Sequence, residues 1–471
     1  MQTHQRVSFA DFILLHEGDD PVRLLLSRDK LRDLHPDIDI DLAVTTLEVR
    51  RKLKNKVPEW YSVPSLIYPF RLSGEQCSSS ETARYKASLI ERFIGEGVLP
   101  ETCGHPRPHK REGPAACGGR GRSEAEAVSG SIPSPIKIAD LTGGMGVDTW
   151  AFSQVSTEVL YNEMNEELAK ATALNFKELN VDNVRVESMK VEPGKVKEVL
   201  DGFEADVIFL DPARRAEDGR KVFLIEECQP DVVGLLPELF AASRYVMVKL
   251  SPMADIAMAC KRLEHVKEVH VVASGGECKE LLFVLDREWE GECSVVVFEG
   301  GAVMEIPGQA RNDNNGARND NNGARNADYG TRNDEPFVKF GIPKEGDVLF
   351  EPGKALAKAG AFNLPCERFG MTKLGIHTHL YTGEAVPEGL KPFGKWFEVL
   401  AVRPLNNRTM KEAGKRYPQA EVTARNIPMT SDLLRKKTGC ASGGDVHLFG
   451  VRLDAGEDAG NYLIETKRID K

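Results

Sequence analysis

The sequence contains no apolar run that approaches the length needed to span a membrane. Its first residues, Met1 to Arg6, lack the charged-then-apolar pattern of a signal peptide. The nine cysteines are scattered without paired spacing, which argues against a disulfide framework and suits a reducing compartment. Basic residues are outnumbered by acidic ones, 62 to 72, and the formal net charge is −10. We therefore expect a cytoplasmic protein in which any contact with nucleic acid comes from a local basic patch.

At 471 residues the chain is too long for a single hydrophobic core, and several domains are expected. Composition and periodicity divide it into an N-terminal helical domain (1–100), a disordered insert (101–134), an α/β sheet domain (135–290), a linker (291–335) and a C-terminal α+β domain (336–471). In the helical domain, the clearest helix is predicted to begin at Ser78, with a capping box to Glu81.

Two of these segments have compositions that cannot build a core. The insert is rich in glycine, proline, serine and charged residues, and the linker contains a seven-residue repeat that begins at Ala310. The repeat has no apolar seam, so it predicts a flexible spacer rather than a coiled coil. Two cysteines and two histidines of the insert match no standard zinc spacing, so no metal site is expected there: Cys103, His105, His109 and Cys117.

A glycine-rich turn lies at the centre of the predicted sheet domain. A short buried strand, Lys137 to Asp140, is followed by Gly143, Gly144 and Gly146, and Val147 to Phe152 then opens a helix. This arrangement of strand, turn and helix brings backbone N–H groups and the positive end of a helix dipole to a ligand. A glycine cluster by itself also fits a plain tight turn, so further residues must decide between the two.

Two carboxylates follow later strands of the same predicted sheet. Glu163 ends the strand that begins at Val159, and Asp211 ends an apolar strand that begins after Asp206. The second strand is apolar between its flanking acids, which indicates burial on both faces, as in a parallel sheet. Functional residues of such sheets collect at the carboxyl ends of the strands, so we expect both acids to lie near the glycine turn.

The motif Asp140-x-Thr-x-Gly-x-Gly146 resembles the first motif of class I S-adenosylmethionine-dependent methyltransferases, with Thr142 where the first glycine often stands. Glu163 matches the acid that binds the ribose in that family. Asp211-Pro-Ala-Arg stands where base-modifying members carry Asp/Asn-Pro-Pro-aromatic. The resemblance implies a Rossmann-like sheet of seven strands, the last one antiparallel, with Glu268 to Val272 and Leu281 to Leu285 as the closing pair.

Further segments resemble one bacterial family of methyltransferases with a THUMP-like C-terminal domain. They are Glu75 to Lys86, Lys249 to Met253, Gly276 to Glu280, and the tail from Phe350 to Phe449. Because THUMP domains occur in RNA-modifying enzymes, this resemblance favours RNA as the substrate.

The resemblance also implies a role for each residue near the turn. Thr142, Gly143, Gly144 and Gly146 would bring the turn to the amino-acid end of S-adenosylmethionine, and Asp140 would hold that end. Glu163 would bind the ribose. The third strand, which begins at Val184, would present Ser188 at its C-terminal edge, beside the adenine.

Asp211, Pro212 and Arg214 are the predicted acceptor-side residues. Asp211 would accept a hydrogen bond from a target amine, and Pro212 would fix the adjacent loop carbonyl. Arg214 replaces the aromatic residue that stacks on a base; it could stack, grip a phosphate or carboxylate, or simply pair with Glu217 or Asp218.

Covalent methylation of a pyrimidine C5 atom needs a cysteine nucleophile after the fourth or fifth strand, and none is present there. Cys228 is expected in a helix. The sequence therefore favours a nitrogen or oxygen acceptor.

Basic residues outnumber acids in the interval between 403 and 437, which indicates either a phosphate-binding surface or an ordinary solvated one. The basic residues are Arg403, Arg408, Lys411, Lys415, Arg416, Arg425, Arg435, Lys436 and Lys437, opposed by Glu412, Glu421 and Asp432. We predict a methyltransferase that uses S-adenosylmethionine to modify a nitrogen of an RNA base. The alternatives are a small-molecule or protein methyltransferase and a non-catalytic binder of cofactor and RNA. A dinucleotide-dependent oxidoreductase is disfavoured because the turn lacks Gly-x-Gly-x-x-Gly spacing.

Overall fold

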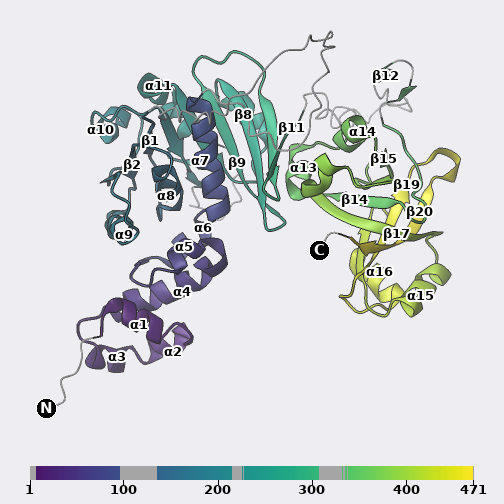
Figure 1. Ribbon diagram of the computed structural model, residues 1–471, viewed down its shortest axis with the longest axis horizontal. Helices are drawn as coiled ribbons and strands as arrows, with labels where there is room; N and C mark the ends of the chain where they lie inside the picture. Colours follow the sequence, from purple (N-terminus) through teal and green to yellow (C-terminus); the bar gives the residue numbers. More distant parts are fainter. Residues whose placement is uncertain are drawn as a thin grey trace, which may run out of the picture. The chain divides into compact units, whose positions relative to one another are not determined.

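The computed structural model describes residues 7–95, 135–214, 225, 228–306, 331–332, 335–336 and 338–469. The predicted insert 101–134 and the heptads from Ala310 lie outside these residues, as do Cys103 and its three neighbours. The chain divides into two compact units, Met1–Lys267 with Phe283–Gly291, and Glu268–Leu282 with Glu292–Lys471 (Figure 1). Within the described part, no helix is both long and apolar enough to cross a membrane.

The first unit begins with helices, as predicted. They are α1 (Phe9–Leu15), α2 (Pro21–Leu26), α3 (Arg28–Leu34), α4 (Ile40–Lys56), α5 (Pro58–Tyr61), α6 (Arg71–Gln76) and α7 (Ser80–Ile94). Apolar residues of α1, α2 and α4, including Phe12, Leu24 and Leu47, form a common core. Helix α7 packs against α8 (Val147–Ser153), the helix that follows the glycine turn.

The predicted start of α7 was wrong by one residue at its cap. Ser79, not Ser78, is the N-cap residue, and its hydroxyl accepts a hydrogen bond from the amide of Thr82 at 3.2 Å. The hydroxyl of Ser78 instead donates to Asp148 at 2.8 Å. Either serine has the chemistry of a cap, so only this distant contact decided between them.

Five neighbouring strands of a nine-stranded sheet are parallel, in the order β7-β4-β1-β2-β3. They are β1 (Lys137–Asp140), β2 (Glu158–Asn162), β3 (Val184–Glu187), β4 (Val207–Leu210) and β7 (Tyr245–Leu250). The remaining helices are α9 (Glu166–Glu178), α10 (Val196–Leu200), α11 (Val232–Ala242) and α12 (Ile256–Arg262). All four residues of β4 are buried, as its apolar run predicted. Short strands β5 (Ala213–Arg214) and β6 (Cys228–Gln229) form an antiparallel pair just beyond β4.

Strands β8 (Val266–Ser274) and β9 (Glu277–Asp286) correspond to the predicted closing pair. Gly275 and Gly276 connect them, both with positive φ, in the two-residue turn that joins antiparallel strands. The predicted Rossmann-like α/β fold is therefore confirmed, but the sheet has nine strands instead of the predicted seven, because residues 294–306 add two.

Residues 294–306, which were expected to belong to a linker, form a β-hairpin instead. Strand β10 (Ser294–Glu299) runs parallel to β8, and β11 (Ala302–Ile306) runs antiparallel to β10. Val295 to Phe298 form a continuous apolar run, and all four are buried. Composition averaged over the whole linker concealed this strand signal.

The C-terminal part of the second unit is a seven-stranded α+β domain, ordered β15-β16-β14-β17-β20-β19-β18. Its strands are β14 (Val348–Pro352), β15 (Thr372–Lys373), β16 (Tyr381–Gly383), β17 (Gly394–Pro404), β18 (Glu421–Arg425), β19 (Val446–Leu453) and β20 (Gly460–Arg468). Its α-helices are α13 (Lys354–Ala359), α14 (Leu364–Phe369), α15 (Asn407–Arg416) and α16 (Ser431–Thr438), and its 3₁₀ turns are η3 (Glu388–Phe393) and η4 (Gly456–Asp458). Two short strands, β12 (Thr331–Arg332) and β13 (Glu335–Pro336), form a separate antiparallel pair. Leu349, Phe397 and Phe449 lie in one core of this sheet, and α15 and α16 cover a second.

Candidate active site

The glycine turn after β1 is closely packed against neighbouring side chains. A Cβ atom on Gly143 would stand 2.2 Å from the ring of Tyr161, and one on Gly146 would stand 2.6 Å from Thr172. Gly146 also has a φ of +89°, which side chains disfavour. Packing alone therefore requires glycine at two of the three positions. Gly144 differs, because a Cβ atom there would meet only the Thr142 carbonyl oxygen, at 4.0 Å.

The side chain of Asp140 holds this turn in place by hydrogen bonds. Its side chain is fully buried, and its two oxygens accept hydrogen bonds from the Thr149 hydroxyl at 2.6 Å and the Thr142 amide at 3.2 Å. Burial raises the pKa of Asp140 to about 7, although the bond from Thr149 acts in the opposite direction. Asp140 thus holds the turn to the first helix after it, and its contact with a cofactor stays a prediction.

Three of the predicted cofactor residues, Gly144, Glu163 and Ser188, lie close together. One carboxylate oxygen of Glu163 accepts a hydrogen bond from the Gly144 amide at 3.0 Å, and the other accepts one from the Asn165 amide at 2.8 Å. The Ser188 hydroxyl donates to the Glu163 carbonyl at 2.9 Å. Each carboxylate oxygen can accept a second hydrogen bond, and Glu163 is partly exposed, so the group can still accept bonds from ligand hydroxyls.

The turn after β1 is tied directly to the loop after β4. The amide of Asp211 donates to the Thr142 hydroxyl at 2.6 Å, which joins the predicted cofactor and acceptor segments. Pro212 is buried beside it. The backbone of Arg214 lies in β5, whereas its side chain, with Glu217 and Asp218, lies outside the described residues.

Cys228 was predicted in a helix and that prediction was wrong. It lies in β6, where its Cα pairs with that of Arg214. The isolated pair of two-residue strands has too few residues to show strand periodicity in the sequence. Cys228 is buried, as expected of a structural thiol rather than a nucleophile.

The Asp211 carboxylate forms an ion pair that no pattern in the sequence predicted. The ammonium group of Lys249, near the end of β7, lies 2.5 Å from Oδ2 of Asp211. The Lys249 side chain is 12% exposed and that of Asp211 38% exposed, so the lysine lies beneath the carboxylate. The parallel pairing of β4 with β7 brings the two residues together.

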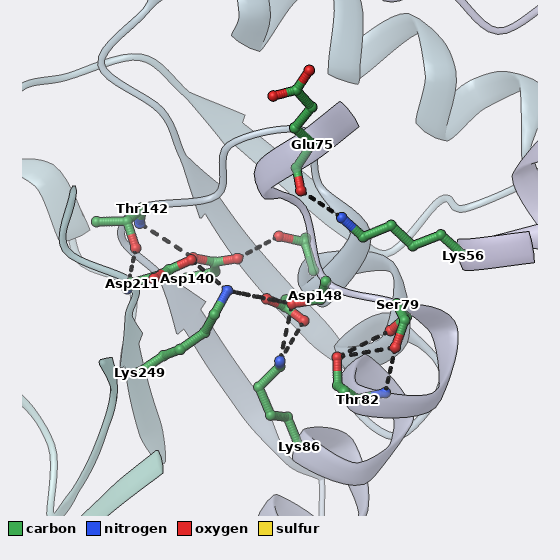
Figure 2. A network of polar contacts seen from close by, with 12 residues as sticks. Lys56, Glu75, Ser79, Thr82, Lys86, Asp140, Thr142, Asp148, Asp211 and Lys249 are labelled. Atoms are coloured by element: carbon green, nitrogen blue, oxygen red, sulfur yellow. Dashed lines mark hydrogen bonds and ion pairs between the residues drawn. The ribbon is translucent and has the colours of Figure 1, made fainter. Parts of the chain in front are cut away.

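A buried polar cluster continues from Lys249 towards α7 (Figure 2). Asp148 lies 3.8 Å from the Lys249 ammonium group and 3.1 Å from that of Lys86, whose side chain is completely buried. Ser78 donates to Asp148 and accepts a hydrogen bond from Lys86 at 3.0 Å. Burial by itself would raise the pKa of Asp148, but Lys86 and Lys249 outweigh it and hold that pKa below its ordinary value.

The sequence contained a signal for part of this cluster. Lys86 is three residues from both Ala83 and Leu89, and therefore on the apolar face of α7. A lysine on that face needs a buried partner, but its identity is not visible in the sequence. Among the described residues, no group of three or more His, Cys, Asp or Glu side chains could hold a metal ion.

Most arginines of the basic C-terminal interval are paired with acids. Arg403 and Arg416 lie 3.4 and 2.5 Å from the buried carboxylate of Glu465, and Arg425 pairs with Glu351. Both acids lie outside the interval counted in the sequence. Arg408 pairs with Glu412, and Arg435 lies 3.8 Å from Asp432. Within the interval 403–437, which the structure describes in full, the exposed basic residues without such an ion pair are four lysines of α15 and α16: Lys411, Lys415, Lys436 and Lys437.

Comparison with protein families places two family matches in the C-terminal domain. Residues 349–389 match a ferredoxin-like domain, and residues 394–468 match a THUMP domain-like family. The predicted THUMP-like character is therefore confirmed for residues 394–468 of the C-terminal domain. No curated protein matches the sequence.

Comparison with solved structures finds a full-length match. A candidate methyltransferase from Porphyromonas gingivalis W83 is 26% identical, with 100% of both chains covered and a TM-score of 0.71. An rRNA methylase from Streptococcus thermophilus is 11% identical over 32% of this chain and 86% of that one, with a TM-score of 0.24. TrmK of M. capricolum, in complex with S-adenosylhomocysteine, is 8% identical over 33% of this chain and 63% of that one, with a TM-score of 0.26. Of these three, only the full-length match is similar enough to bear on the fold and class of this chain.

Proposed function

We propose that this protein is an S-adenosylmethionine-dependent methyltransferase that methylates a nitrogen of an RNA base. The observation that carries the proposal is the hydrogen bond from the Asp211 amide to Thr142. It joins the turn expected to bind the cofactor to the loop expected to meet the acceptor, at the carboxyl ends of adjacent parallel strands. The full-length likeness to the candidate methyltransferase supports the enzyme class.

The residues around the turn fit this cofactor. The space beside Gly144 allows close approach of a ligand to the backbone, and Glu163 can accept hydrogen bonds from ribose hydroxyls. When bound, S-adenosylmethionine supplies an electrophilic methyl group on a positively charged sulfur. Asp140, held by Thr149, keeps the turn in place beneath it.

On the acceptor side, Asp211 accepts a hydrogen bond from the target amine and so directs the nitrogen lone pair. Methyl transfer requires little covalent assistance, and positioning is the main contribution that the protein makes. The buried Pro212 restricts the loop next to Asp211. Burial of Cys228 disfavours the covalent route to carbon methylation, which leaves nitrogen or oxygen as the acceptor.

The THUMP-like match supports RNA as the substrate, and the four exposed lysines of α15 and α16 are its proposed phosphate contacts. Because the neighbouring arginines are paired, the lysines form a smaller basic surface than the sequence suggested.

The test is methylation by the purified protein with radiolabelled S-adenosylmethionine. RNA stripped of protein, extract freed of RNA, and a small-molecule fraction are the three substrates, and Asp211→Ala is the control for background transfer. Label in the RNA alone is expected. Label only in the protein or small-molecule fraction would reject an RNA substrate, and cofactor binding without any transfer would indicate a non-catalytic binder. Calorimetric preference for NAD over S-adenosylmethionine would reject the cofactor.

A further inference from the structure

The proposed reaction needs the Asp211 carboxylate in one orientation, but Asp211 follows the end of β4 and its side chain is 38% exposed. The bond to Thr142 fixes its backbone amide and leaves the side-chain torsions free. If the carboxylate rotated away, the amine lone pair would no longer point at the methyl group. A second contact must therefore hold the side chain.

Lys249 supplies that contact. Its ammonium group lies 2.5 Å from Oδ2 of Asp211, and its own side chain is largely buried. A pair that is partly shielded from water is less screened than a surface ion pair, so its geometry is better maintained. A carboxylate has a second oxygen, which can accept the hydrogen bond of a substrate.

Buried polar groups also hold the Lys249 side chain in place. Its ammonium group lies 3.4 Å from the Ser78 hydroxyl and 3.8 Å from Asp148, which also pairs with Lys86. Positive and negative charges thus alternate from Lys86 through Asp148 and Lys249 to Asp211 (Figure 2). Each charge compensates the desolvation of its neighbour. Of the four side chains, Asp211 is the most exposed, and it stands on the proposed acceptor loop.

We propose that Lys249 is a positioning residue for methyl transfer, because it orients the Asp211 carboxylate towards the acceptor amine. Ser78, Lys86 and Asp148 in turn fix Lys249. This inference rests on the proposed function. In the step, the nitrogen lone pair forms the bond to the methyl carbon, the electrons of the broken C–S bond stay on sulfur, and the resulting ammonium proton leaves to water.

The experiment compares three variants of the full-length protein. Lys249→Met removes the charge, Lys249→Arg keeps it, and Lys137→Met is the matched control. Lys137 is also a strand lysine in an ion pair, 3.0 Å from Glu158, but it lies at the opposite end of the parallel strands. The measurements are turnover on RNA, calorimetric affinity for S-adenosylhomocysteine, and the orientation of the Asp211 carboxylate in crystal structures of the wild type and the variants.

For Lys249→Met, we expect turnover to fall about 10²-fold, the effect of misplacing a reacting group. Affinity for S-adenosylhomocysteine should stay within about twofold of the wild type, because Lys249 acts on the acceptor side. The Asp211 carboxylate should rotate away from its wild-type orientation, and Lys249→Arg should restore part of the turnover and of that orientation. Lys137→Met should match the wild type in all three measurements.

An unchanged orientation of the Asp211 carboxylate in the crystal structure of Lys249→Met would overturn the inference, as would an equal loss of turnover and cofactor affinity. The structural comparison does not need a methyl acceptor. If the wild type failed to methylate RNA, the proposed function would be rejected, while the structural comparison would still decide whether Lys249 positions Asp211.

Discussion

The buried ammonium group of Lys86 lies 3.1 Å from Oδ1 of Asp148, and this ion pair joins α7 to the first helix after the glycine turn. Each residue also contacts Ser78. The helical N-terminal segment is therefore connected by charge, as well as by packing, to the region of the proposed active site.

Loss of Lys86 should destabilise the protein strongly. Lys86→Met leaves Asp148 buried with only the more distant Lys249 as a cationic partner, and removal of one member of a buried pair costs about 3–5 kcal/mol. Urea unfolding measures the change, with Lys170→Met, which removes an exposed pair with Glu166, as the control. In the double variant Lys86→Met with Asp148→Asn, stability should partly recover. If Lys86→Met and Lys170→Met had the same free energy of unfolding, the buried ion pair would not stabilise the fold.

The free energy of unfolding should depend on pH through Asp140. Burial raises its pKa from 3.8 to about 7 in the folded protein. Between these values the unfolded chain releases the proton while the folded protein retains it, so stability falls as pH rises from about 4 to 7 and then levels off. The loss amounts to about 4 kcal/mol at most. Asp140→Asn cannot ionise, so wild-type stability relative to this variant should fall across the same window. A constant difference between pH 4 and 8 would contradict the shift.

Glu163 and Asp211 should affect different steps. Glu163→Gln should weaken S-adenosylmethionine binding by about 1–3 kcal/mol, the effect of losing a charged hydrogen-bond acceptor. Asp211→Ala should lower turnover with little change in cofactor affinity. Calorimetry and single-turnover kinetics measure the two effects, and Glu166→Gln, at an exposed acid of the next helix, is the control. Equal loss of affinity in both variants would show that Asp211 binds the cofactor or stabilises the fold.

The lysines of α15 and α16 should determine the salt dependence of RNA binding. Replacing Lys411, Lys415, Lys436 and Lys437 with glutamine should reduce the slope of log affinity against log salt by about 0.7 for each phosphate that the variant no longer binds. Fluorescence anisotropy at several salt concentrations measures the slope. Arg408→Gln on α15 is the matched control, because its guanidinium is already paired with Glu412. An unchanged slope in the fourfold variant would place the RNA-binding surface elsewhere.

Removal of residues 101–134 or of residues 308–335 should be nearly neutral. The second segment contains β12 and the first residue of β13, which pair only with each other. Neither segment has an apolar pattern that could offset the entropy of ordering, about 1–2 kcal/mol per residue. Each deletion, closed with a short Gly-Ser bridge, should leave the melting temperature and cofactor affinity unchanged, as measured by calorimetry. If deletion of 308–335 abolished RNA binding in a folded protein, the repeat would be a binding arm rather than a spacer.

The local pattern of the sequence determined the central elements of the sheet domain. Breakers, apolar runs and glycine spacing placed β1, the turn and β4, because these signals act over a few residues. The N-cap of α9 is local in the same way, because Asn165 is a residue type that caps helices and its side chain accepts a hydrogen bond from the Leu168 amide. The edge hairpin β10–β11 was missed when its short apolar run was averaged into a polar linker.

Tertiary structure alone decided how the charged residues are partnered. Ser78 and Lys86 belong to α7 and the residues just before it, whereas Asp148 lies in α8 and Lys249 in β7. Their pairing exists only after α7 packs on α8 and β7 joins the sheet. The same holds for Arg416 and Glu465, which converted part of an apparent basic surface into a buried ion pair. The physical reason is that a charge can be buried only beside a compensating partner, and that partner is set by contacts between residues far apart in the chain.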